Sequence, residues 1–199
     1  MPRLKRQTDS RERLLEAAYE LFFEQGYAAT SVDQIIERAG LTKPTVYSHF
    51  PSKEALCVAY LQERRRRVLT QQRREIREAK SAEEGFMATM RLVREAMIEY
   101  DFRGCGFFNL VAEIPDPTNP VVIEAKDFSE RYREEIREAV IALRDSDLKY
   151  AGIDVDRVTE TYYLIQCGAI MASQELRELW PLDRAMDDVA RLLAGLAES

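Results

Sequence analysis

The sequence is poor in glycine, proline, cysteine and histidine. Its eight Gly and seven Pro fall at the ends of long segments with a 3.6-residue period, and this placement favours an all-helical protein without strands. Cys57, Cys105 and Cys167 are an odd number without CxxC spacing, so neither a disulfide framework nor a zinc site is predicted. We expect each cysteine to be a small buried hydrophobic residue.

Long apolar runs and catalytic motifs are also missing. No apolar run approaches the roughly 18 residues of a membrane span, and MPRLKRQTDSRERL has no apolar stretch of a secretion signal, so we expect a cytoplasmic protein. The sequence contains one histidine, His49. It has neither a Gly-rich phosphate-binding loop nor a cluster of metal-ligand residues. The sequence therefore predicts a protein that is not an enzyme and has no catalytic residues, cofactor or metal.

The net charge of -6 is unevenly distributed. Residues 1–80 hold 16 Lys+Arg against 11 Asp+Glu, a balance of +5, which leaves 13 against 24, or -11, for residues 81–199. A basic N-terminal part joined to an acidic remainder is typical of a nucleic-acid reader on its own domain. The run Arg64 to Arg67 lies about 16 Å beyond Lys53 along a helix, further than a Debye length of about 8 Å, and is interpreted as solvated or inter-domain.

Three short helices are predicted in the first 50 residues. The first covers about 9–25 and ends at Gly26, because its apolar residues share one face. The second begins at Ser31, where SVDQ has the form of a capping box, and ends at Gly40. The third covers about 42–49. Two short helices joined by a Gly-containing turn and preceded by a supporting helix indicate a helix-turn-helix motif, whose second helix reads DNA.

The segment LTKPTVYSHFPSK carries the candidate DNA contacts. Lys43 and Lys53 lie just inside helix N-termini, where the dipole disfavours a cation by about 0.3–1 kcal/mol unless a phosphate docks there. Tyr47 can pack its ring while its hydroxyl reaches a phosphate. The alternatives are ordinary surface lysines and a core tyrosine with a wet tip. Short donors suited to base edges or backbone are Thr42, Thr45 and Ser48.

TSVDQIIERAGLTKPTVYSHFPSKEAL, Thr30 to Leu56, resembles the DNA-binding domain of the TetR family of bacterial transcriptional regulators. The preceding LLEAAYELFFEQGY is similar to the first helix of that family. The resemblance implies a homodimer, usually a repressor, that a small ligand in the C-terminal domain releases from its operator. By matching position it implies recognition-helix contacts by Thr42, Lys43, Thr45, Tyr47, Ser48 and His49, with Lys53 meeting a phosphate.

The remainder is predicted to form a helical bundle, which gives about nine helices in total. A helix from 52 to about 79 links a helix-turn-helix DNA-binding domain, residues 1–52, to a ligand-binding and dimerisation domain, residues 53–199. The later helices are expected at about 81–103, 104–114, 120–145, 154–178 and 182–197.

The aromatic and Met content of this second domain suits a pocket. Most of these side chains are expected in an ordinary core, but a Met and aromatic lining with a few polar groups, such as Asn109 and Gln166, is typical of a site for a small, mainly apolar ligand. The charge of -11 over residues 81–199 favours a neutral or cationic effector over an anionic one. The predicted lining residues are Met90, Met97, Phe108, Tyr132 and Tyr163.

The last two helices are the predicted dimer interface. Small residues such as Gly168, Ala169 and Ser173 permit close approach, and the final helix has an apolar face, so two helices from each subunit would form a four-helix bundle. An intramolecular core is the alternative.

The functional hypothesis is a sequence-specific regulator, a homodimeric repressor of a palindromic operator on double-stranded DNA. The alternatives are an architectural DNA-binding dimer without an effector, and a regulator that senses redox state through Cys105.

Overall fold

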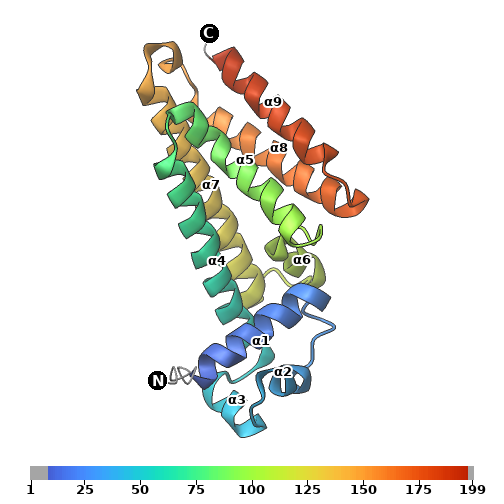
Figure 1. Cartoon of the computed structure of the whole chain (residues 1–199). Coiled ribbons are helices and arrows are strands. Elements are labelled where there is room, and N and C mark those ends of the chain that lie inside the picture. Colours follow the sequence, from blue (N-terminus) through green and yellow to red (C-terminus); the bar gives the residue numbers. More distant parts are fainter. Residues whose placement is uncertain (1–8, 197–199) are drawn as a thin grey trace, which may run out of the picture. The chain divides into compact units, whose positions relative to one another are not determined.

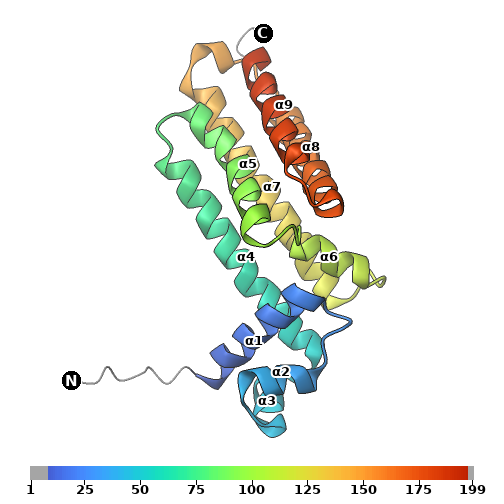
Figure 2. The same cartoon turned by 45° about the vertical axis from the view of Figure 1, so that its right-hand side comes forward.

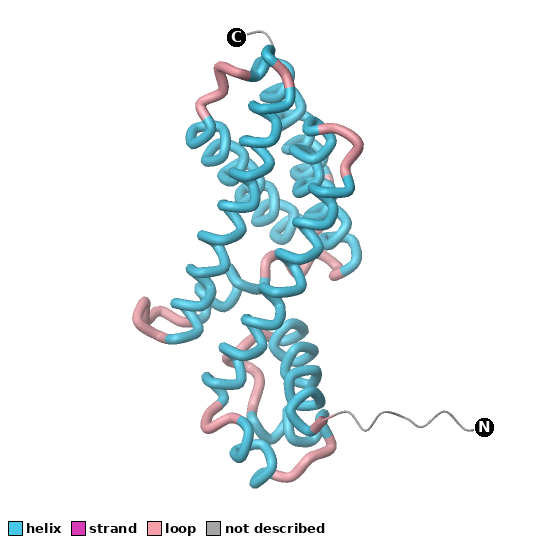
Figure 3. The backbone as a smooth tube through the Cα atoms, turned by 90° about the vertical axis from the view of Figure 1, so that its left-hand side faces the viewer, coloured by secondary structure: helices cyan, strands magenta, loops and turns pink. Residues whose placement is uncertain are grey.

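The computed structural model describes residues 9–196, and every regular element in that range is helical (Figures 1 and 3). The predicted all-α fold is confirmed. The helices are α1 Ser10–Gln25, α2 Val32–Ala39, α3 Lys43–His49, α4 Lys53–Glu78, α5 Ala82–Glu99, α6 Gly106–Glu113, α7 Pro120–Ser146, the 3-10 turn η1 Leu148–Tyr150, α8 Val155–Leu176 and α9 Trp180–Leu196.

Local side-chain bonds determine where several helices begin and end. At α2, the Ser31 hydroxyl accepts from Gln34 N at 3.2 Å while Gln34 Oε1 accepts from Ser31 N at 2.7 Å, which confirms the capping box. Gly40 ends α2 with φ of 61°, a left-handed conformation that glycine adopts without strain. Ser81 caps α5 by accepting from Glu84 N at 3.1 Å.

The chain forms two compact units. Unit 1 contains the residues up to 64 together with 106–126, and unit 2 contains 65–105 and the residues from 127 on. These units differ from the predicted domains 1–52 and 53–199, because α6 and the first turns of α7 fold with the N-terminal helices. The functional division of the chain into a reader and an effector domain stays a prediction.

In unit 1, α1 packs on α2, and both helices contact α3 (Figure 1). Tyr60 of α4 lies against this layer with its ring 5.5 Å from that of Tyr19. Arg64 is 8% exposed; its guanidinium lies 4.7 Å from the Phe23 ring and donates to the Tyr19 hydroxyl at 3.1 Å. Arg64 is therefore a buried side chain of unit 1, so a solvated position is wrong for this residue, while its contacts with α1 agree with the inter-domain alternative for the predicted boundary at residue 52.

In unit 2, α8 lies along α9, and α5 contacts both helices (Figure 2). The ring centroids of Phe86 and Tyr162 lie 5.1 Å apart in an edge-on arrangement. Val189 of α9 and Ile136 of α7 are also buried. Within residues 9–196, no helix combines the length and apolar character that crossing a membrane requires.

Candidate functional site

Helix α3 presents most of the predicted DNA contacts to solvent. Val46 and Phe50 are buried and hold the helix against unit 1. Tyr47 is 45% exposed, so the alternative of a core tyrosine is wrong. Thr45 is half-buried. The other predicted contacts on this helix and at its cap are exposed, namely Thr42, Lys43, Ser48 and His49.

The hydroxyl groups of this helix bond locally. Thr42 Oγ1 and Thr45 Oγ1 lie 2.9 Å apart, and Ser48 Oγ donates to the Thr45 carbonyl at 2.7 Å. Thr42 makes no side-chain bond to the backbone of α3. These three side chains keep acceptor capacity and, being short hydroxyls, can exchange their local bonds for bonds to DNA.

Lys43 and Lys53, the two lysines predicted at unfavourable positions near helix N-termini, both have partners within unit 1. Lys43 Nζ lies 3.5 Å from Asp33 Oδ1 in an exposed ion pair, which contributes at most about 1 kcal/mol. Lys53 Nζ donates to the carbonyls of Tyr27 at 2.9 Å and Thr30 at 3.0 Å, and lies 4.1 Å from the Tyr27 ring. Lys53 therefore ties the α1–α2 loop to the start of α4. The contact of Lys53 with a DNA phosphate stays a prediction. Because the ammonium group already has partners within the protein, it does not need a phosphate to satisfy it.

We expect Lys53→Met to destabilise the protein by about 1.5–3 kcal/mol, because hydrogen bonds from a charged group are lost and two carbonyls lose a donor. Urea denaturation of the full chain measures this difference. Lys43→Met, which breaks only an exposed ion pair, is the matched control and should cost less than about 1 kcal/mol. Equal stability of wild type and Lys53→Met would show that the tether contributes nothing.

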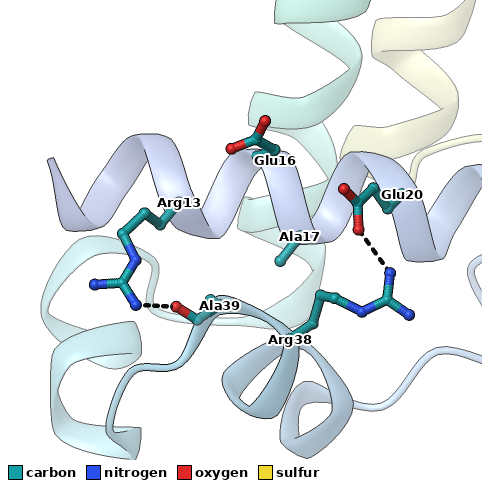
Figure 4. Close-up of a pocket in the computed structure, with 6 residues that line it drawn as sticks. All are labelled: Arg13, Glu16, Ala17, Glu20, Arg38 and Ala39. Atoms are coloured by element: carbon teal, nitrogen blue, oxygen red, sulfur yellow. Dashed lines mark hydrogen bonds and ion pairs between the residues drawn. The ribbon is translucent and has the colours of Figure 1, made fainter. Parts of the chain in front are cut away.

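A groove of about 270 Å³ runs between α1 and α2 (Figure 4). Arg13 reaches across it and donates to the carbonyls of Ala39 and Gly40, which closes the end of α2. Arg38 pairs with Glu20 at 2.6 Å on the same surface. The groove is open, and the polar side chains that line it bond α1 to α2. These bonds stabilise the two helices on which α3 packs. The groove does not resemble an apolar ligand pocket.

Helix α6 is bonded to the α1–α2 loop. Glu113 Oε2 accepts from Ala28 N at 2.7 Å, and a Cβ on Gly26, where φ is 90°, would lie 2.6 Å from Glu113 Oε1. The positive φ favours glycine at this position, whereas the flexible end of Glu113 could move away from an added Cβ. Glu113 was not predicted from the sequence, because a contact across 85 residues leaves no local signal.

The predicted effector residues divide between the two units. Met90, Met97 and Tyr132 are buried and Tyr163 is half-buried in unit 2, whereas Phe108 belongs to unit 1. Desolvation raises the pKa of the Tyr132 phenol well above its usual value of 10.0, so this side chain is neutral at physiological pH. The ligand-binding role of these residues stays a prediction.

A buried polar cluster lies in unit 2. Gln72 Nε2 donates to Thr89 Oγ1 at 3.2 Å, and Gln166 Nε2 donates to the Thr89 carbonyl at 3.3 Å. Gln166 was predicted from the sequence as a polar group of the pocket, whereas Gln72 was not. Of its other polar candidates, Asn109 is half-buried and belongs to unit 1.

The cysteines are free thiols with different surroundings. The expected burial is confirmed for Cys57, where desolvation raises the pKa far above its ordinary value. Cys105 and Cys167 are only half-buried. Desolvation also raises the pKa of Cys167, against a smaller lowering by its hydrogen bond with Tyr163, which disfavours the reactive thiolate at that position.

Two of the three small residues predicted at the α8 interface face the interior of unit 2, and the third, Gly168, is exposed. Ala169 and Ser173 are buried, as are Ala185 and Val189 on α9, so the intramolecular alternative holds for this part of the predicted interface. A different stripe of α8 is exposed: Leu164 is 68% and Met171 63% accessible. Leu176 near the end of α8 and Trp180 at the start of α9 are also exposed.

Comparisons with known proteins agree with this geometry. Residues 14–60 match the family described as bacterial regulatory proteins, tetR family. The chain is 33% identical over 114 residues to the HTH-type transcriptional activator FasR of Mycolicibacterium smegmatis, a segment that covers 57% of this chain and 50% of FasR. It thus matches only half the length of that relative.

Two further similarities extend over nearly the whole chain. The HTH-type transcriptional repressor DhaR of Mycobacterium sp. is 25% identical, with 96% of each protein covered. The crystal structure of SCO4454, a TetR-family transcriptional regulator from Streptomyces coelicolor, superimposes with a TM-score of 0.85 at 26% identity and covers 96% of this chain and 97% of that one.

Proposed function

Because the chain belongs to the TetR family of bacterial transcriptional regulators, we propose that it is a homodimeric repressor that a small, mainly apolar molecule releases from a palindromic operator. The exposed face of α3 carries this proposal: Tyr47, Ser48 and His49 project from a helix that Val46 and Phe50 anchor. A short helix with donors on its outer face has the chemistry to read a major groove. The repressor role draws on the similarity to DhaR, whereas FasR is named an activator.

The experiment is selection of bound DNA from a random library at stated salt. We expect an inverted repeat whose half-sites lie one helical turn, about 34–36 Å, or a multiple of it apart. Failure to enrich any sequence would favour the architectural alternative, and enrichment of a single half-site would contradict the dimer.

Changes on α3 should separate base reading from backbone contact. Thr45→Ala and Ser48→Ala are expected to change the enriched sequence, because a mismatched base contact costs about 1–3 kcal/mol. Repeating the selection with each variant measures this. Glu16→Ala, at an exposed position of α1, is the control and should enrich the wild-type sequence. If all three variants select the same site, α3 does not read bases through these hydroxyls.

A dimer through the last two helices is supported by the exposed apolar stripe of α8. Leu164 and Met171 are seven residues apart and so lie on one helix face, with the exposed Gly168 between them. Large apolar side chains gathered on one surface mark an interaction site. The stripe replaces Ala169 and Ser173 as the proposed interface, since those two side chains are buried within the subunit.

Effector release is proposed to act through α4. This helix carries Gln72 in the interior of unit 2 and, 19 residues earlier, the Lys53 tether of the reader. Both residues belong to one helix, α4. Movement of α4 on ligand binding would change the separation of the two recognition helices. Ligand and operator then weaken each other reciprocally, typically about 5- to 150-fold.

A further inference from the structure

Two glutamine side chains from different helices meet the same threonine inside unit 2. Gln72 of α4 and Gln166 of α8 are each 1% exposed. Both donate to Thr89 of α5, Gln72 to its hydroxyl and Gln166 to its carbonyl. The two carboxamides are therefore brought together by a shared partner.

Each carboxamide keeps an acceptor without a partner. Neither Gln72 Oε1 nor Gln166 Oε1 receives a hydrogen bond from the protein. Exchanging the oxygen and nitrogen of Gln166 would set its oxygen against the Thr89 carbonyl, so its orientation is determined. Gln72 meets a hydroxyl, which can donate or accept, so the orientation of Gln166 decides the chemistry of the place. A buried acceptor without a donor is costly and rare in native proteins, and the one on Gln166 indicates a place for a donor.

The side chains around Gln72 and Gln166 indicate the charge of the molecule that could bind there. Within residues 9–196, the buried polar side chains of unit 2 are all uncharged; they are Gln72, Thr89, Thr159, Gln166 and Ser173. Desolvation raises the pKa of the Tyr132 and Tyr162 phenols, which keeps both side chains neutral. A charged group here would lose its hydration among side chains that are themselves uncharged and buried.

We propose that Gln72 and Gln166 bind the O–H or N–H donor of a neutral, mainly apolar molecule, with Met90 and Tyr132 against its apolar part. This inference deepens the proposed effector release and rests on it for its regulatory meaning. A water molecule offers the same donor chemistry, and the experiment separates the two occupants. Thr89 acts as a positioning residue, because it orients both carboxamides.

The probes are 1-octanol and 2-naphthol, each paired with its methyl ether, which keeps the apolar body and removes the donor. Calorimetry on the full chain is expected to show that each bound alcohol binds at least about tenfold more tightly than its ether, because a site built around a substrate hydroxyl rejects the analogue that lacks it. In Gln72→Met with Gln166→Met, which retains side-chain length, the preference should fall below about twofold. Gln71→Met, exposed and next to Gln72 on α4, is the matched control and should keep the wild-type preference.

Equal binding of alcohol and ether to the wild type would overturn the inference and leave water as the occupant. Absence of binding by both alcohols, or an unchanged preference in the double variant, would overturn it too. The wild-type comparison does not depend on the folding of any variant. Operator titrations keep the two proposals apart: a hydroxyl preference without any effect on operator affinity refutes effector release alone, whereas operator binding without alcohol binding refutes this site alone.

Discussion

Leu164→Arg combined with Met171→Arg is expected to convert the protein to monomers and to lower operator affinity by at least about 100-fold. Two linked readers gain about 10²- to 10⁴-fold in avidity over a single reader, and this gain is lost when the subunits separate. Arginine at these exposed positions leaves the subunit core intact but places like charges at a two-fold interface, where the same surface meets itself. Analytical ultracentrifugation and DNA titration at one salt concentration measure both effects.

Leu148→Arg is the control for this pair. Leu148 is 91% exposed and lies in η1, outside the α8 stripe, so the same substitution there should leave both association and operator binding unchanged. A double variant that remains dimeric would remove the stripe from the interface. A monomeric variant with full operator affinity would show that dimerisation is not needed for recognition.

Glu113→Ala is expected to weaken the coupling between effector and operator. Glu113 connects α6 to the α1–α2 loop through Ala28 N, and the same loop is tethered to α4 by Lys53. Without the carboxylate, the loop loses its bond to α6 and keeps the Lys53 tether to α4, so the release of typically about 5- to 150-fold should weaken without being abolished. Operator titration with and without a bound effector measures the coupling.

Operator affinity without effector should change little in this variant, because Glu113 lies outside α3 and is exposed. Glu16→Ala, another exposed carboxylate of unit 1, should keep the full release. Unchanged coupling in Glu113→Ala would show that the signal travels through α4 alone, and α6 would then have no part in it.

The sequence by itself determined the helices and several of their ends. Ser31 and Gln34 are three residues apart and satisfy each other's backbone within one turn, and Gly40 ends α2 by its own conformational freedom. Tyr47 of α3 was not settled in this way, because a core tyrosine with an exposed hydroxyl remained an alternative until the burial of Val46 and Phe50 left Tyr47 outside. The features that the sequence settled are the helix ends. Such features depend on neighbours within a turn or two of chain, so a local pattern contains them.

Only the tertiary structure decided which distant groups became partners. Lys53 donates hydrogen bonds to two carbonyls of a loop more than 20 residues earlier in the chain. Arg64 is buried against aromatic rings of α1. Bonds across 85 and 77 residues attached Glu113 to the reader and Gln166 to Thr89. Each of these side chains could equally have been solvated. Their partners follow from how whole helices pack, and that packing sums many small apolar contacts along the chain, which no single stretch of sequence contains.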